Sequence, residues 1–267
     1  MDISKQHDEC IANMHISFAV IGGVGFSRLA NQSQMTLHTE YGAVVAFISK
    51  MGDNNVLFIP RHAGDSGHVP PHKINYRAII MAIKQFGITR VISVNSVGTM
   101  QGHPIGSIAI PCDFVDFTHG RPSTFFENET VHADMSDPYC PQLCSLIRSI
   151  LNEKGIQTDD VVYACTEGPR FETKAEIRML SNFADVVGMT GVPEVILAKE
   201  MQLCYASVCL ITNMASGIES SRPTATEVLD VLTSRKDFIF ELLHSIASHM
   251  PIERECQCNY AIDDGTL

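Results

Sequence analysis

Short apolar runs bounded by glycine, proline or asparagine alternate along the chain with longer stretches that repeat apolar residues at helical spacing. The short runs predict buried strands at His15 to Ile21, Val44 to Ile48, Val56 to Ile59, Arg90 to Val94, Ser107 to Ile110, Asp160 to Cys165, Asp185 to Met189 and Cys204 to Thr212. The longer stretches predict helices at Asn75 to Phe86, Pro141 to Lys154, Thr173 to Phe183, Val192 to Met201 and Thr226 to Met250. This alternation favours a three-layer α/β/α fold with a mixed, largely parallel central sheet.

The 267 residues are close to the upper size at which a single core suffices, and no linker or repeat divides the pattern. We therefore expect one domain over residues 1–267, with a short N-terminal extension (1–14) and a C-terminal tail (251–267). Residues 118–137 lack periodicity and are expected to form a functional loop or an interface.

The chain carries a formal net charge of −11, which would repel nucleic-acid phosphates and anionic membranes. Neither nucleic acid nor a membrane is therefore an expected partner. The first residues lack the apolar stretch of a secretory signal, and no later run is long enough to span a bilayer, so we expect a cytoplasmic protein.

The nine cysteines are mostly scattered through apolar runs, which favours buried thiols over a disulfide framework. Cys256 and Cys258 form a CxC pair in the tail that is either unremarkable or a redox-sensitive or disulfide-forming clip. Because no second Cys or His pair occurs at metal spacing, we expect no metal site.

Polar residues follow several of the predicted strands, where ligands bind in open α/β sheets. The turn Gly22-Gly23-Val24-Gly25 allows close approach of an anion to the main chain, although a simple tight turn is an equally good interpretation. Arg61 and His62 follow another strand, and Ser96 ends a third. These three strand ends favour an anion site.

The segment from Thr166 to Glu176 follows a strand and opens a helix. Thr173 and Glu176 have the spacing of a capping box. Glu172, just before the cap, either favours the helix dipole or accepts a hydrogen bond from a heterocyclic N–H.

The runs GPRFETKAE, ADVVGMTGVPEVILAKE and CYASVCLITNMASGI, together with PRH and HKINYRA, resemble the trimeric purine nucleoside phosphorylase and methylthioadenosine phosphorylase family. The resemblance covers about Ile16 to Ile246. It implies phosphorolysis of a purine nucleoside to free purine and ribose 1-phosphate or 5-methylthioribose 1-phosphate, with phosphate as co-substrate and no cofactor.

The resemblance also implies the site residues. Those expected to bind phosphate are Gly22, Gly23, Arg61, His62, Ser96 and Thr190. Those expected to bind the nucleoside are Val97, Gly98, Phe171, Glu172, Met189, Asn213, Ala215, Ala225, Leu229 and, from a neighbouring subunit, His132. Catalytic roles are expected for Asn213, Glu172 and His62. The contribution of His132 implies a homotrimer or a dimer of trimers.

A 6-oxopurine presents an N1–H donor and an O6 acceptor, which suit Glu172 as acceptor and Asn213 as donor. Family members that prefer adenine nucleosides usually carry aspartate at the position of Asn213. Oxopurine enzymes often place a histidine near the 5′-hydroxyl, where this chain has apolar Ala225 and Leu229. The combination predicts methylthioinosine as substrate, with inosine and guanosine as alternatives.

Two departures from the family pattern concern phosphate. Val24 stands where the family usually has Thr or Ser, which removes one hydrogen bond and predicts weakened phosphate affinity. The loop after Arg61 and His62 carries an insertion relative to the family pattern, which leaves the role of His68 open. Alternative hypotheses are a methylthioadenosine phosphorylase, a nucleosidase that uses water, and a purine-binding protein without activity.

Overall fold

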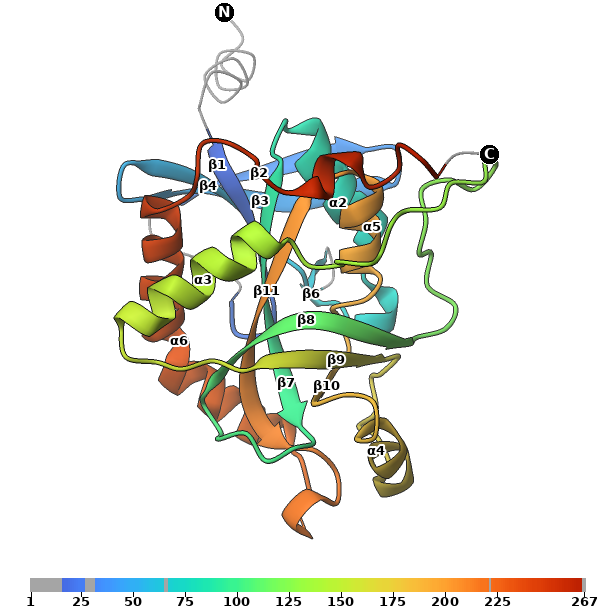
Figure 1. Ribbon diagram of the computed structural model, residues 1–267, viewed down its shortest axis with the longest axis vertical. Coiled ribbons are helices and arrows are strands. Elements are labelled where there is room, and N and C mark those ends of the chain that lie inside the picture. Colours follow the sequence, from blue (N-terminus) through green and yellow to red (C-terminus); the bar gives the residue numbers. More distant parts are fainter. Residues whose placement is uncertain (1–15, 27–31, 65–66, 221, 266–267) are drawn as a thin grey trace, which may run out of the picture.

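The apolar runs form the centre of one nine-stranded sheet in a computed structural model that describes residues 16–26, 32–64, 67–220 and 222–265 (Figure 1). The strands are β1 (Ile16–Gly22), β2 (Gln32–Thr39), β3 (Gly42–Met51), β4 (Asn54–Pro60), β7 (Arg90–Thr99), β8 (Ile108–Phe117), β9 (Asp160–Thr166), β10 (Val186–Gly188) and β11 (Cys204–Met214). Their order is β10-β9-β8-β11-β7-β1-β4-β3-β2. A separate two-stranded hairpin consists of β5 (Ala63–Gly64) and β6 (Gly67–His68).

Helices cover both faces of this sheet, so the predicted three-layer α/β/α architecture is confirmed. The helices are α2 (Tyr76–Gln85), α3 (Pro141–Glu153), α4 (Lys174–Leu180), α5 (Glu194–Glu200) and α6 (Ala225–Ser248), with short 3₁₀ turns η1 (Pro71–Lys73), η2 (Ile218–Ser220) and η3 (Gln257–Tyr260). Figure 1 shows α3 and α6 together on one side of the sheet and α2 and α5 on the other.

The sheet is mixed, and parallel pairings occupy its centre. Strand β1 is parallel to both β4 and β7, and β7 is parallel to β11. Antiparallel pairs join β11 to β8 and build the β4-β3-β2 edge. Strand β10 pairs with β9 in parallel and with β7 in antiparallel fashion, so β7, β11, β8, β9 and β10 form a closed ring. Strands β7 and β11 therefore end side by side, and β10 begins beside Thr99 at the carboxyl end of β7 and runs back along it.

All eight predicted strands and five predicted helices are present, with boundaries shifted by a few residues. The predicted first strand begins at His15, which lies outside the described residues, as does the predicted extension 1–14. Strand β2 was missed, because its sequence QSQMTLHT is mostly polar and forms an exposed edge of the sheet.

The predicted tail packs against the body of the protein. The backbone N–H groups of His132 and Asp134 donate to the carbonyls of Gly265 and Ala261 at 2.8 and 2.7 Å. Arg254 Nη2 donates to the carbonyl of Gln202 at 2.8 Å. These contacts tie the tail both to the 118–137 segment and to the start of β11.

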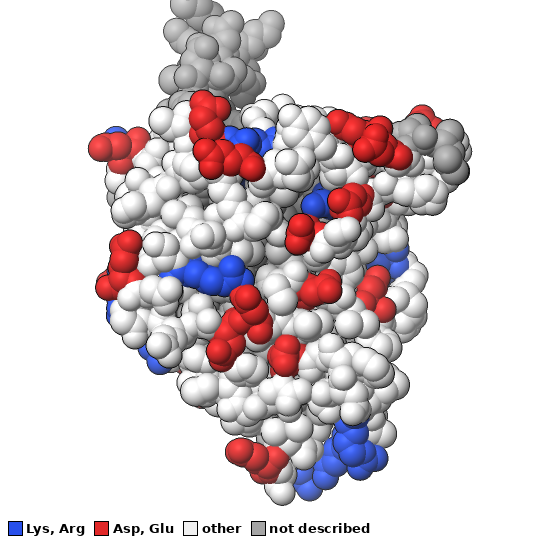
Figure 2. All heavy atoms as spheres, in the orientation of Figure 1, with Lys and Arg blue, Asp and Glu red and all other residues white. Residues whose placement is uncertain are grey.

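The visible face of the molecule carries acidic and basic side chains in scattered groups rather than one broad basic surface (Figure 2). This agrees with the formal net charge of −11. Within the described residues, none of the helices has the length and apolar character that crossing a membrane requires.

Candidate active site

A cavity of about 550 Å³ opens where the strand ends converge. It is large enough for a ligand of nucleoside size. Of the residues predicted for the site, fourteen line it: Gly23, Arg61, His62, Ser96, Val97, Gly98, Phe171, Glu172, Met189, Thr190, Asn213, Ala215, Ala225 and Leu229. Gly22 and His132 are not part of its lining.

The glycine-rich turn after β1 packs closely against neighbouring strands. A Cβ on Gly22 would lie 2.6 Å from the Phe58 ring, and one on Gly23 would lie 2.8 Å from the Val94 carbonyl oxygen. The Gly23 N–H already donates to that Val94 carbonyl at 3.1 Å. The glycines therefore allow close packing of β1 on its neighbours, and the Gly23 amide is occupied in this state.

Arg61 is buried and its guanidinium is paired with Glu194. Nε and Nη2 donate to the two carboxylate oxygens at 2.7 and 2.9 Å, while Nη1 makes only a 3.3 Å contact with the Val94 carbonyl. Burial alone would lower the pKa of Arg61, but Glu194 offsets this and raises it, so the charge is retained. Ser93 and Tyr205 also donate to Glu194, at 2.7 Å each.

His62 is held beside this cation in its neutral form. Its Nδ1 lies 2.8 Å from the Val69 carbonyl, which fixes the proton on Nδ1 and leaves Nε2 as an acceptor. Burial and the adjacent Arg61 charge lower the pKa of His62 to about 4. The ring of His68, another residue of the cavity lining, stacks on His62 with centroids 4.6 Å apart.

Thr190 reaches the same end of the cavity from the segment after β10. Its hydroxyl donates to Asn95 Oδ1 at 3.0 Å. Asn95 Nδ2 in turn donates to Ser93 and Ser207. Thr190 is thus fixed by a buried polar network that also includes the Arg61–Glu194 pair through Ser93.

Asn213 is turned into the cavity by an irregularity in β11. The pairing with β7 skips one residue between Ile211 and Asn213, as in a β-bulge. Thr212 Oγ1 donates to Asn213 Oδ1 at 2.9 Å, and Asn213 Nδ2 donates to the Met214 carbonyl at 3.0 Å. One of the two amide hydrogens therefore remains for a ligand.

Glycine at position 98 makes room for that amide. A Cβ there would lie 3.0 Å from Asn213 Nδ2 and 3.5 Å from the Val187 side chain. A side chain at this position would crowd the donor of Asn213.

Glu172 faces the cavity from the loop before α4, and the predicted capping box of Thr173 and Glu176 is confirmed. Thr166 Oγ1 donates to Glu172 Oε1 at 2.5 Å. Burial raises the pKa of Glu172, partly offset by this hydrogen bond. The carboxylate is thus held in place with a second oxygen to offer.

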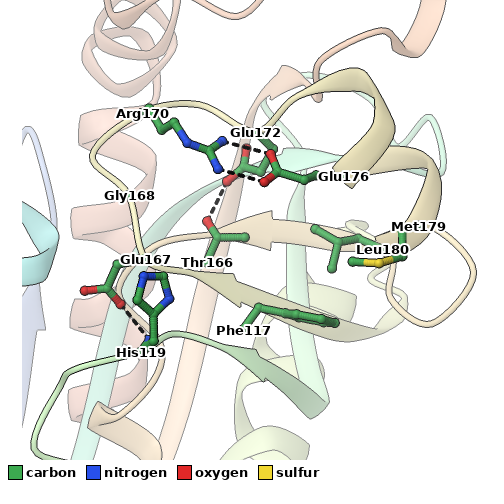
Figure 3. A pocket seen from close by; sticks show the side chains of 10 residues that line it. All are labelled: Phe117, His119, Thr166, Glu167, Gly168, Arg170, Glu172, Glu176, Met179 and Leu180. Carbon is green, nitrogen blue, oxygen red and sulfur yellow. Dashed lines mark hydrogen bonds and ion pairs between the residues drawn. The ribbon is translucent and has the colours of Figure 1, made fainter.

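A second, smaller cavity of about 280 Å³ shares Glu172 with the first. Figure 3 shows Arg170 and Glu176 facing each other beside Glu172, with Thr166 on the neighbouring strand. Arg170 pairs with Glu176 and Thr166 with Glu172, so these polar groups of the second cavity already have partners within the protein.

Arg121 is a positioning residue that sequence reasoning missed. Its side chain is almost fully buried; Nη1 donates to the Met189 and Val192 carbonyls at 2.9 and 2.8 Å, and Nη2 to the Glu167 carbonyl at 2.6 Å. It also pairs with the Glu167 carboxylate at 3.0 Å. One side chain from the predicted functional loop therefore joins the two segments that carry Glu172 and Met189. The only indication of this role in the sequence is an arginine within the long segment 118–137 that lacks periodicity.

One wall of the cavity is apolar. Pro223, Ala225, Val228 and Leu229 line it from the start of α6 and the residues before it. The 47% exposure of Leu229 shows that this wall is open to a ligand or a covering element.

The sequence and the fold correspond to a known family. The chain belongs to the phosphorylase superfamily, whose family model matches residues 17–248. It is 49% identical over 249 residues to a Methanosarcina acetivorans protein named probable S-methyl-5′-thioinosine phosphorylase, covering 93% of this chain and 96% of that one. It is 37% identical to the 6-oxopurine nucleoside phosphorylase of Pyrococcus furiosus, covering 93% of this chain and 98% of that one.

Solved structures agree with this assignment. A crystal structure of methylthioadenosine phosphorylase from an antarctic soil metagenomic library superposes with a TM-score of 0.84 at 28% identity, covering 94% of this chain and 92% of that one.

Proposed function

We propose that this protein catalyses the phosphorolysis of 6-oxopurine nucleosides and that S-methyl-5′-thioinosine is its preferred substrate. The main support for this proposal is that a single cavity is lined by the Arg61 guanidinium, by the Asn213 amide and the Glu172 carboxylate, and by an apolar wall at Ala225 and Leu229. The names of the relatives support the same reaction class.

Phosphate occupies the end formed by Arg61, His62, Ser96 and Thr190. Nη1 is the guanidinium nitrogen available to it, because Glu194 engages the other two. Neutral His62 accepts a hydrogen bond from a protonated phosphate oxygen or a ribose hydroxyl, and a bound dianion favours its protonation. Phosphate beneath the sugar stabilises the cationic ribose of the transition state and then attacks it.

The purine leaves with negative charge, and Asn213 donates a hydrogen bond to it. Glu172 accepts the N1–H of a 6-oxopurine, for which an ionised carboxylate is the matched partner. Adenine has no N1–H and would leave the second oxygen of this buried carboxylate without a donor, at a cost of about 1–3 kcal/mol. Met189 and Phe171 lie against the sugar and base.

At the 5′ end, the apolar wall of the first turn of α6 suits a methylthio group better than a hydroxyl. His132 lies outside the cavity lining and is exposed on the protein surface. We infer that it completes the 5′ end of a neighbouring subunit's site in a homotrimer. The reaction needs phosphate as co-substrate and no cofactor.

The test is purine release from methylthioinosine, inosine and methylthioadenosine, each with and without phosphate. Phosphate-dependent release of hypoxanthine, fastest from methylthioinosine, is the expected result. Release that is independent of phosphate would mean a nucleosidase. A preference for methylthioadenosine would overturn the roles given to Glu172 and Asn213, and tight binding without turnover would overturn the assignment as an enzyme.

Two variants test the base subsite and the 5′ subsite independently. Glu172→Gln should reduce turnover of 6-oxopurines more than of methylthioadenosine. Leu229→Ser should lower the preference for methylthioinosine over inosine and leave the base preference unchanged. If each variant alters both preferences equally, the assignment of separate base and 5′ subsites is wrong.

A further inference from the structure

Four buried cysteines meet at the end of the sheet opposite the nucleoside cavity. Cys140 immediately precedes α3, Cys204 begins β11, and Cys256 and Cys258 flank the start of η3 in the tail. Their sulfur atoms all lie within 4.8 Å of one another. Cys204 is separated from Asn213 by nearly the whole of β11, about 30 Å.

The spacing of the sulfur atoms suits a tetrahedral metal site. Tetrahedral zinc with Zn–S bonds of about 2.3 Å places its four sulfurs about 3.8 Å apart. The Cys204 and Cys256 sulfurs are 3.3 Å apart, and the remaining separations stay within 4.8 Å. A disulfide would require about 2.05 Å, and every cysteine among the described residues is a free thiol.

The surroundings also supply a countercharge. Four thiolates around Zn²⁺ carry a net charge of about −2. Arg254, two residues before Cys256, donates from Nη2 to the carbonyl of Gln202, two residues before Cys204, and its Nε is buried without a hydrogen-bond partner in the described part of the chain. A nearby cation of this kind stabilises an anionic tetrathiolate centre.

We propose that Cys140, Cys204, Cys256 and Cys258 bind one structural zinc ion that fastens the C-terminal tail to the core. Binding replaces four S–H protons, which pass to solvent, by four Zn–S bonds and changes no oxidation state. The ion joins three segments that are far apart in the sequence. Through the tail it also supports His132 and Asp134, whose backbone N–H groups donate to Gly265 and Ala261.

This site departs from the expectation of no metal centre, which was drawn from sequence spacing alone. The CxC pair supplies two ligands that are visible in the sequence. The other two come from residues 140 and 204, which only the packing of α3 against β11 brings to the tail.

The test begins with the metal content of the full-length protein, purified in the presence of a reductant that does not bind zinc and measured by plasma mass spectrometry. We expect about one zinc per chain. Titration with a mercurial should release the metal to a colorimetric chelator as the thiols react. Cobalt should replace the zinc and give the intense visible bands of tetrahedral thiolate coordination.

Variants locate the ion. Replacing both Cys256 and Cys258 with serine should abolish binding and lower Tm, whereas Cys112→Ser should retain the zinc, because Cys112 is an exposed thiol outside the cluster. If the double variant fails to fold, cobalt spectra of the unaltered protein still test the coordination.

Several results would overturn the proposal. They are four reactive thiols without stoichiometric metal, intact masses that reveal disulfides among these cysteines, iron in place of zinc, or zinc retained after Cys256 and Cys258 are replaced. Phosphorolysis is measured separately, so failure of the zinc site leaves the proposed function untouched, and the converse also holds.

Discussion

Replacing Asn213 with aspartate tests the base site most directly. The change keeps the size of the side chain and the oxygen that accepts from Thr212 at 2.9 Å. It removes the amide donor that we assign to the purine. It also places an oxygen 3.0 Å from the Met214 carbonyl, where the amide nitrogen donates in the native chain.

The size of the effect follows from those contacts. One hydrogen bond to a group that gains charge contributes about 1.5–3 kcal/mol, which corresponds to a loss of roughly tenfold to a hundredfold in kcat/KM for methylthioinosine. Methylthioadenosine should lose less, because a carboxylate accepts from its 6-amino group. The substrate preference should therefore move toward the 6-aminopurine. The contact between the new oxygen and the Met214 carbonyl should also lower the stability of the enzyme, which affects the turnover of both nucleosides.

The assay is steady-state phosphorolysis of both nucleosides at saturating phosphate, with Tm measured alongside. Asn152→Asp, on the exposed side of α3, introduces the same charge away from the cavity and should change neither rate. An equal loss on both substrates by Asn213→Asp would refute the reasoning, because it would place the whole effect in folding or in the phosphate step.

Three further changes test other parts of the cavity. Val24→Thr should restore a donor to phosphate and lower its KM by roughly tenfold; an unchanged KM in phosphate titrations would show that this side chain does not reach the anion. His62→Gln should flatten the dependence of unfolding free energy on pH: because the folded pKa of His62 is about 4 and the unfolded value about 6.5, the unfolded state binds more protons between them and the native chain loses stability as pH falls through that window. Urea unfolding at several pH values measures this, and identical slopes would contradict the buried neutral imidazole. Arg121→Lys keeps the charge but loses the forked donors to three carbonyls, so it should cost at least about 2 kcal/mol of stability and raise the nucleoside KM; a wild-type KM together with a wild-type Tm would exclude the positioning role.

The sequence predicted the interior of the sheet well because buried strands in this fold are continuous apolar runs between turn residues. It missed β2, since an edge strand with one exposed face has no such run. Gly22 stays a predicted phosphate ligand, but it does not line the cavity, and the 2.6 Å between an added Cβ and the Phe58 ring shows that packing alone already requires a glycine there. A glycine-rich turn looks the same in sequence whether its neighbour is an anion or an aromatic ring.

The residues that sequence reasoning missed act through long-range contacts. Arg121 has its effect only because β8 leads the following loop back to the carbonyls of Met189 and Val192. Glu194 becomes the partner of Arg61 only when α5 packs beside α2 and β11. No local periodicity encodes either pairing, so these residues were named only as parts of their segments.

The site itself depends on the closure of the ring of strands. Strand β10 pairs with Gly98 and Thr99 of β7 as well as with β9, which brings Met189 and Thr190 beside the end of β7. The irregularity at Thr212 then turns Asn213 toward the same space, with Gly98 leaving room for its amide. The proposed phosphate and purine ends therefore share β7 as a common wall, and strand pairing fixes the separation between Thr190 and Asn213. A rigid separation of this kind holds the nucleophile and the leaving group on opposite sides of the glycosidic bond, which phosphorolysis requires.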